Sequence, residues 1–167
     1  MVFKEFCTKL DESLSNHCKG IFFDYLNDRT KNKKLALYKD IKNVFKFEEY
    51  LDSIKHYNQR RCLTKFRISS HKLNIERGRY VNINRNERLC KQCESQNIED
   101  EFHYLMKCPK YSDIRKKLFS AANETVRNFM QMSDQSKFLI LLKNESTLIT
   151  EATAKFIHHG MYIRKDC

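Results

Sequence analysis

In the stretch 90-CKQCESQNIEDEFHYLMKC-108, nineteen residues hold three of the chain's seven cysteines and one of its six histidines. The spacing is Cys90-x2-Cys93, then nine residues, then His103-x4-Cys108. Three thiolates and one imidazole complete a tetrahedral shell around Zn²⁺ and leave no position for water. The spacing therefore predicts a closed, structural zinc site that supplies folding energy and not hydrolytic power.

The local sequence argues against other uses of these cysteines. A redox Cys-x-x-Cys pair normally opens a helix after a strand, and no βαβ pattern surrounds this one. Disulfides conflict with the lack of an export signal, and coincidental core thiols do not explain a pair placed among Lys, Gln and Glu. We expect a short helix from near Glu99 to near Cys108, loosened at its end so that His103 and Cys108 aim at one point.

The acidic residues at the start of that helix have two readings. They can hold the second ring nitrogen of His103, or they can be favourable charges at a helix N-terminus. We expect the second role for Glu99, Asp100 and Glu101.

Composition indicates a mainly α protein. The chain has 167 residues, 41% of them hydrophobic and 32% charged, with only three glycines and one proline, so an all-β fold with many tight turns is disfavoured. No apolar run is long enough for a membrane helix, and the charged start MVFKEFCTKLDESL has no signal-peptide core. We therefore expect an intracellular protein, nuclear or cytoplasmic and not secreted, that has reduced thiols and no membrane partner.

Hydrophobic periodicity divides the chain into helical segments around the zinc pattern. Helices are predicted over 2–18, which 21–26 can extend, then 35–45, 47–54, 55–73, a stretch from Pro109, 135–143 and 147–164. The predicted organisation is an N-terminal helical segment (1–45), a basic helix and arm (46–88), the zinc module (89–110) and C-terminal helices (111–167). The fold class is thus mainly α, a helical domain with a small embedded Cys-Cys-His-Cys zinc knuckle.

Positive charge is concentrated before and within the zinc pattern. From Lys55 to Lys91 the sequence contains eleven Lys or Arg and only two Glu, so this stretch carries +9 of the net charge of +11. The 55–73 helix places Gln59, Leu63, Phe66, Ser70 and Leu73 on one stripe that can be buried, with basic flanks, and an irregular arm follows it. Such a surface is typical of phosphate binding, although a solvated basic face is the simpler alternative. The candidate phosphate contacts are Arg60, Arg61, Lys65, Arg67, Lys72, Arg77, Arg79, Arg85, Arg88 and Lys91.

Four fragments carry a resemblance to a known family: RRCLTKFRISSHKLNIERGRY, ERLCKQCE, IEDEFHYLMKCPKY and IRKKL. Together they resemble the region C-terminal to the polymerase in animal non-LTR retrotransposon reverse transcriptases, most strongly over residues 46–118. The resemblance implies that Cys90, Cys93, His103 and Cys108 are zinc ligands. The family's catalytic Asp-Asp box is absent, so the resemblance implies the tail of such an element without its catalytic parts: a truncated copy, a domesticated copy, or a gene model cut from a larger reading frame.

Three functions follow as hypotheses. The first is a non-catalytic module that binds RNA or DNA, with Tyr57 and Tyr80 available to stack on bases and Phe102 better suited to the core. The second is a zinc-stabilised interaction module whose C-terminal helices, rich in apolar residues at 139–142 and 156–157, dock on a separate polymerase domain or self-associate. An enzyme is the third and least supported, because no nucleophile or phosphate-loop motif is present.

Overall fold

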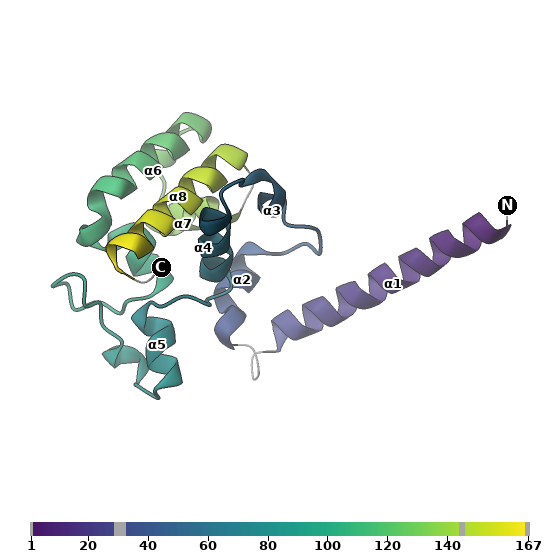
Figure 1. Ribbon diagram of the computed structural model, residues 1–167, viewed down its shortest axis with the longest axis horizontal. Coiled ribbons are helices and arrows are strands. Elements are labelled where there is room, and N and C mark those ends of the chain that lie inside the picture. Colours follow the sequence, from purple (N-terminus) through teal and green to yellow (C-terminus); the bar gives the residue numbers. More distant parts are fainter. Residues whose placement is uncertain (1, 29–32, 144–145, 166–167) are drawn as a thin grey trace. The chain divides into compact units, whose positions relative to one another are not determined.

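The computed structural model describes residues 2–28, 33–143 and 146–165 (Figure 1). All regular elements in these ranges are helical, and extended pairing is limited to one antiparallel bridge between Leu89 and Ile98. The prediction of a mainly α chain with a small embedded Cys-Cys-His-Cys cluster is confirmed. None of the helices in the described ranges combines the length and apolar character needed to cross a membrane.

The chain forms two compact units, Met1–Phe47 and Glu48–Cys167. The first contains helix α1 (Val2–Asn27), a 3-10 turn (Lys33–Leu35) and helix α2 (Ala36–Ile41). Helix α1 continues through 21–26, as the sequence allowed, and the Phe22 ring packs on Phe23 and Phe45 at centroid distances of 5.2 and 5.3 Å. The helix predicted over 35–45 is shorter than expected, because regular structure ends at Ile41.

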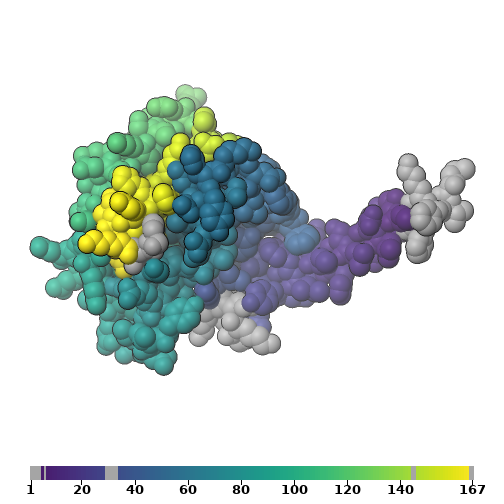
Figure 2. Space-filling model, in the orientation of Figure 1, coloured from purple at the N-terminus to yellow at the C-terminus, as the bar shows by residue number. Residues whose placement is uncertain are grey.

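The second unit holds the remaining helices: α3 (Tyr50–Ser53), α4 (Tyr57–Arg67), α5 (Asn74–Tyr80), α6 (Ser112–Thr125), α7 (Asp134–Lys143) and α8 (Thr147–Ile163). Short 3-10 turns cover Arg85–Glu87, Pro109–Tyr111 and Phe129–Gln131, and a π turn covers His103–Lys107. Helix α8 packs against both α6 and α4, and Figures 1 and 2 show it lying between them. The three predicted C-terminal helices are confirmed, whereas the helix predicted over 47–54 shrinks to the four residues of α3.

The core of the second unit is built around Tyr104, which is fully buried. Its ring contacts Phe66, Tyr111 and Phe156 at centroid distances of 5.6, 4.7 and 5.7 Å. Its hydroxyl donates a 3.0 Å hydrogen bond to the carbonyl of Ile157 in α8. This approach needs a glycine at position 160, because a Cβ there would overlap the tyrosine hydroxyl. The π turn is therefore locked onto α8 by one aromatic side chain.

Most of the apolar residues predicted to dock on another protein are used inside this unit. Leu141, Leu142, Phe156 and Ile157 are all buried. The expectation that these side chains form an exposed patch is therefore wrong.

The predicted 55–73 helix is also too long. Helix α4 ends at Arg67, and Ser69 takes a left-handed conformation with φ of 49°. The Ser70 N–H bonds to the Lys65 carbonyl at 2.7 Å, and the Ser69 N–H bonds to the Phe66 carbonyl at 3.2 Å. This pair of bonds is the Schellman C-cap, which usually has glycine where serine stands here. Ser70 is consequently exposed, and the predicted arm begins with a regular helix, α5.

Candidate metal centre

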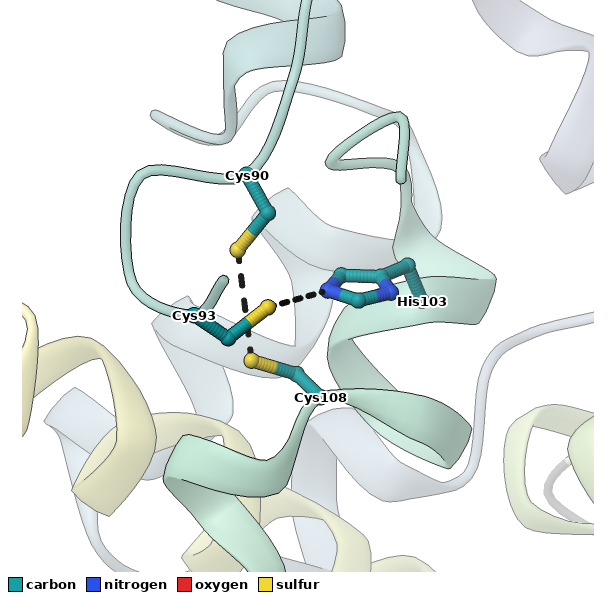
Figure 3. A group of neighbouring side chains, drawn as sticks. All are labelled: Cys90, Cys93, His103 and Cys108. Carbon is teal, nitrogen blue, oxygen red and sulfur yellow. Dashed lines mark hydrogen bonds between the residues drawn. The ribbon is translucent and has the colours of Figure 1, made fainter. Parts of the chain in front are cut away.

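Four side chains from two short segments converge on one point, as Figure 3 shows. Cys90 and Cys93 lie on the turn that follows the Leu89 bridge, whereas His103 starts the π turn and Cys108 follows it. Their potential ligand atoms, three Sγ and one imidazole nitrogen, all lie within 4.8 Å of one another. Three of the four residues are buried and Cys93 is half-buried. This group can hold a metal ion.

Two of the distances between these atoms match those of a tetrahedral shell. Cys90 Sγ lies 3.9 Å from Cys108 Sγ, and Cys93 Sγ lies 3.4 Å from His103 Nε2. Metal–sulfur bonds of about 2.3 Å and a metal–nitrogen bond of about 2.0 Å place tetrahedral S···S pairs about 3.8 Å apart and S···N pairs about 3.5 Å apart. All four positions of such a shell would be filled by protein atoms. The arrangement suits a structural ion and leaves no position for a reacting water.

Backbone hydrogen bonds shape the first pair of ligands. The Cys90 N–H bonds to the Asn97 carbonyl at 2.8 Å, which closes the loop between the two segments. The Gln92 N–H points at Cys90 Sγ at 3.4 Å, and the Ser95 hydroxyl lies 3.0 Å from Cys93 Sγ. Donors directed at sulfur favour the thiolate form that a metal requires.

The second pair depends on the π turn. The Cys108 N–H bonds to the His103 carbonyl, five residues back, at 2.7 Å. This wider turn confirms the predicted loosening, which lets residues five apart point at one centre; π turns are frequent at functional sites. Asp100 accepts the His103 N–H at 2.8 Å, so it caps the turn as expected for an acid at a helix N-terminus. Arg115 of α6 secures the other end by donating to the Leu105 and Cys108 carbonyls at 2.8 and 2.6 Å.

The electrostatics of the four groups are uneven. Burial raises the pKa of Cys90 and of Cys108 above the ordinary thiol value. Burial would also raise the pKa of Cys93, but hydrogen bonds from Ser95 outweigh it and lower that pKa. Burial lowers the pKa of His103, which keeps the imidazole neutral and its lone pair available. Without a cation the two buried sulfurs retain protons, so metal binding releases protons and weakens as pH falls.

Two of the neighbouring acids make long-range contacts that the sequence did not indicate. Glu101 accepts hydrogen bonds from the Ser69 hydroxyl at 2.6 Å and from His71 Nε2 at 2.9 Å. Burial would raise the pKa of Glu101, but the bonds and charge of His71, with the bond from Ser69, hold it below its usual value. Both donors belong to the loop that connects α4 to α5. Glu101 thus ties this loop to the π turn that contains His103.

Glu99 makes a second tie. It is 1% exposed and pairs with Arg164 at the end of α8. It also accepts the Asn74 N–H at 2.8 Å, and its other oxygen lies 3.7 Å from Cys90 Sγ. The predicted helix-terminus role therefore holds for Asp100, whereas Glu99 and Glu101 join the cluster to α8 and to the loop before α5. No pattern in the sequence signals these ties, because their partners lie 25 to 65 residues away.

The candidate phosphate contacts differ in how far they are exposed to solvent. Six are exposed: Arg61, Lys65, Lys72, Arg77, Arg85 and Lys91. Arg85 lies 3.9 Å from Asp100. Arg60 and Arg79 are half-buried, and they bond to the Ile54 carbonyl at 2.9 Å and to Glu76 at 2.9 Å. The exposed six lie on α4, α5 and the loops that follow each helix.

Two of the candidate arginines have internal roles. Arg67 is 1% exposed, pairs with Glu48 at 3.0 Å and lies 4.8 Å from the centre of the Tyr50 ring, so its prediction as a phosphate contact is wrong. The basic flank of α4 does not face solvent along its whole length, because its last residue turns toward Glu48 and Tyr50. Arg88 is half-buried, lies across Gly78 and donates to the Ile75 and Ile83 carbonyls at 2.8 and 2.9 Å. Its guanidinium braces the arm against α5.

No family model, curated protein or solved structure matches the chain. The resemblance to the reverse-transcriptase tail region therefore stays a prediction.

Proposed function

We propose that this chain is a non-catalytic, zinc-stabilised module that binds RNA or DNA. The proposal includes the retrotransposon origin: the chain corresponds to the tail region of a non-LTR reverse transcriptase. The four clustered side chains would hold Zn²⁺, and the exposed cations of α4, α5 and the arm would contact phosphates.

Zinc is the ion that best suits this donor set. Three thiolates and one imidazole are soft or borderline ligands, whereas Mg²⁺ and Ca²⁺ prefer oxygen. The tetrahedral spacing and the absence of an open position favour a structural Zn²⁺ over a catalytic ion. When bound, the ion supplies folding energy and takes no part in a reaction.

The observation that carries the nucleic-acid proposal is the tie between the cluster and the basic surface. Glu101 holds the loop that contains Lys72, and Glu99 holds the first N–H of α5, the helix that carries Arg77. The cluster therefore fixes the positions from which these cations project. Fixed cations lose less entropy on binding a polyanion than cations on a mobile chain.

Exposed aromatic residues support the same proposal. The side chains of Tyr57 and Tyr80 are 63% and 72% exposed, at the start of α4 and the end of α5. Stacking on unpaired bases is the usual use of aromatic rings beside a cationic surface. Phe102 instead packs edge-on against Phe138 at 5.4 Å, in line with a core role.

Salt-dependent binding tests the proposal. Fluorescence anisotropy would measure the Kd of the zinc-loaded full chain for single-stranded RNA and DNA across a series of salt concentrations. With six phosphate contacts, affinity for a single strand should fall about 300-fold between roughly 50 and 200 mM salt. Binding that is absent or insensitive to salt would contradict the proposal.

Charge-matched variants locate the surface. The triple variant Arg77→Gln, Arg85→Gln and Lys91→Gln removes three exposed charges from α5 and the arm, and it should weaken binding about tenfold or more and reduce the salt slope. The control replaces Lys110, Lys116 and Lys143 with Gln, which removes the same charge from exposed positions outside residues 55–91. An equal loss of affinity in the two triple variants would indicate a non-specific charge effect.

A further inference from the structure

A cavity of about 320 Å³ lies where α4 meets α8 and the loop at 68–73. Its lining includes Arg61, Lys65, Ser70, Lys72, His158 and Met161. Figure 2 shows α4 and α8 side by side on the visible face of the second unit. This volume is at the lower end of small-ligand pockets, about 300 Å³, and leaves room for a group the size of one nucleotide.

The charge of this cavity is one-sided. Arg61, Lys65 and Lys72 line it, and no carboxylate does. Two other cavities in the unit have acids in their linings, Glu87 in one, and Glu124 and Glu151 in the other. Three cations with no carboxylate in the lining suit a doubly charged phosphate monoester better than a singly charged phosphodiester of a continuous strand.

The loop on one side of the cavity is held in place. The carbonyl of Lys72 accepts a hydrogen bond from Arg164, and His71 is fixed between Glu101 and the Leu73 N–H. The wall from α8 includes Met161, which is 6% exposed and gives an apolar surface to a base or sugar. Asn58, Ser70 and His158 add hydrogen-bonding groups to the lining. The cavity thus combines cations on a helix and on a tethered loop, polar groups and an apolar wall.

A second basic cavity adjoins the same loop. Arg164, which bonds to the Lys72 carbonyl, also lines a cavity of about 370 Å³ together with Arg77 and Lys91. A strand whose end lies in the first cavity therefore has cations available for its next phosphates. A second cavity with cations beside the same loop favours a nucleic acid over an isolated phosphate ester or a phosphopeptide.

We propose that the cavity of Arg61, Lys65 and Lys72 binds the terminal phosphate of a nucleic-acid strand. The inference rests on the proposed nucleic-acid function and adds a preference for phosphorylated ends. Either end carries the same phosphate chemistry, so the test contains both polarities.

The test compares strands that differ only at their ends. Single strands of about twelve nucleotides, within the usual site size, carry or lack a 5′-phosphate with the dye at the 3′ end. A mirrored pair carries or lacks a 3′-phosphate with the dye at the 5′ end. The zinc-loaded full chain should bind the phosphorylated strand of one pair about fivefold to tenfold more tightly, since one charge-assisted contact contributes about 1–1.5 kcal/mol.

Two triple variants with equal charge change separate the cavity from the rest of the surface. Arg61→Gln, Lys65→Gln and Lys72→Gln should abolish the preference for the phosphorylated end. Arg77→Gln, Arg85→Gln and Lys91→Gln should weaken both strands and retain the ratio. All six side chains are exposed, so both variants should keep the wild-type helical circular dichroism.

Direct titration of the wild-type chain supplies an independent reading by NMR. Adenosine 5′-monophosphate should shift the amide signals of Lys65, Ser70 and Lys72, and adenosine should not. Equal shifts with phosphoserine would overturn the assignment to nucleic acid. Strand binding with no end preference, or a preference that survives in the cavity variant, would overturn this inference alone. If the wild-type chain binds none of the strands, the proposed function is overturned as well.

Discussion

Residues 81–98 and helix α8 are held in place by different forces. Between Val81 and Ile98, Cys90 is the only buried residue, and the single bridge of Leu89 with Ile98 supplies little regular pairing. Helix α8 instead buries apolar residues along its length, among them Ile149, Phe156 and Ile157. Hydrophobic burial can hold α8 in place. It cannot hold residues 81–98, because the only apolar side chain that they bury is a cysteine. Hydrogen bonds such as those of Arg88, together with a bound ion, are the interactions available to fix this segment.

Three contacts connect residues 99–107, which follow the first region, to helix α7, helix α8 and the residue after α8. Arg164 pairs with Glu99 in the interior, Tyr104 packs over Gly160, and Lys107 pairs with Asp134 at the surface. These contacts differ in burial, so removing each of them should lower the free energy of unfolding by a different amount.

Removal of a ligand should have the largest effect. Cys108→Ser takes a fully buried sulfur from the cluster, and we expect loss of the metal together with most of the roughly 10 kcal/mol or more that structural zinc supplies. Hydrogen exchange should show lost protection at the amides of Cys90, Glu99 and Cys108, with α8 amides retaining theirs. Cys18→Ser, at an exposed position, is the control and should change neither metal content nor exchange. Full protection of these amides in the Cys108→Ser variant would contradict the claim that a bound ion helps to hold residues 81–98 in place.

Breaking the interior ion pair should come second. Arg164→Met leaves the Glu99 carboxylate in a buried site without its guanidinium partner, which should lower the free energy of unfolding by about 3–5 kcal/mol. The double variant with Glu99→Leu should regain a large part of that loss. Urea unfolding of the two single variants and the double variant measures the coupling. Additive losses would show that the two residues act independently.

Crowding the aromatic contact should have a smaller cost. Gly160→Ala places a methyl group against the Tyr104 hydroxyl, and we expect a loss of about 1–3 kcal/mol in unfolding free energy. Gly20→Ala in α1 is the matched control: its Cβ meets no atom within 4 Å, so the change should stabilise that helix by about 1 kcal/mol. Thermal unfolding of both variants gives the comparison. An unchanged midpoint for Gly160→Ala would mean that α8 and the π turn do not touch as described.

The surface ion pair should contribute least. The hydrogen bond from Lys107 is the main cause of the lowered pKa of Asp134, with attraction to Lys107 and Lys137 adding to it. A lowered pKa in the folded state adds stability above the unfolded value, about 3.9, and that stability is lost as pH falls through the folded pKa. Because both side chains are well exposed, Asp134→Asn should cost only about 0.5 kcal/mol at pH 7 and nothing near pH 2. A larger loss, or one independent of pH, would argue against this pairing.

The ligands and the C-terminal helices could be predicted from the sequence because both are local patterns. The spacing of Cys90, Cys93, His103 and Cys108 fits one ion, and three- and four-residue periodicity marks the helices through 112–163. The end of α4 could not be predicted, since Ser69 takes a conformation for which glycine is the usual signal. The burial of Arg67 depends on Glu48, nineteen residues earlier, and periodicity does not indicate which charged stripe finds a partner.

Zinc K-edge X-ray absorption of the purified full chain tests most directly whether these four residues hold one ion. We expect one zinc per chain with three sulfur neighbours at about 2.3 Å and one nitrogen at about 2.0–2.1 Å. The Cys93→Ser variant should show two sulfurs if it retains metal. A wild-type spectrum with two or fewer sulfurs, with water or carboxylate oxygen in the shell, or with no bound zinc would contradict the claim that these four residues hold one ion.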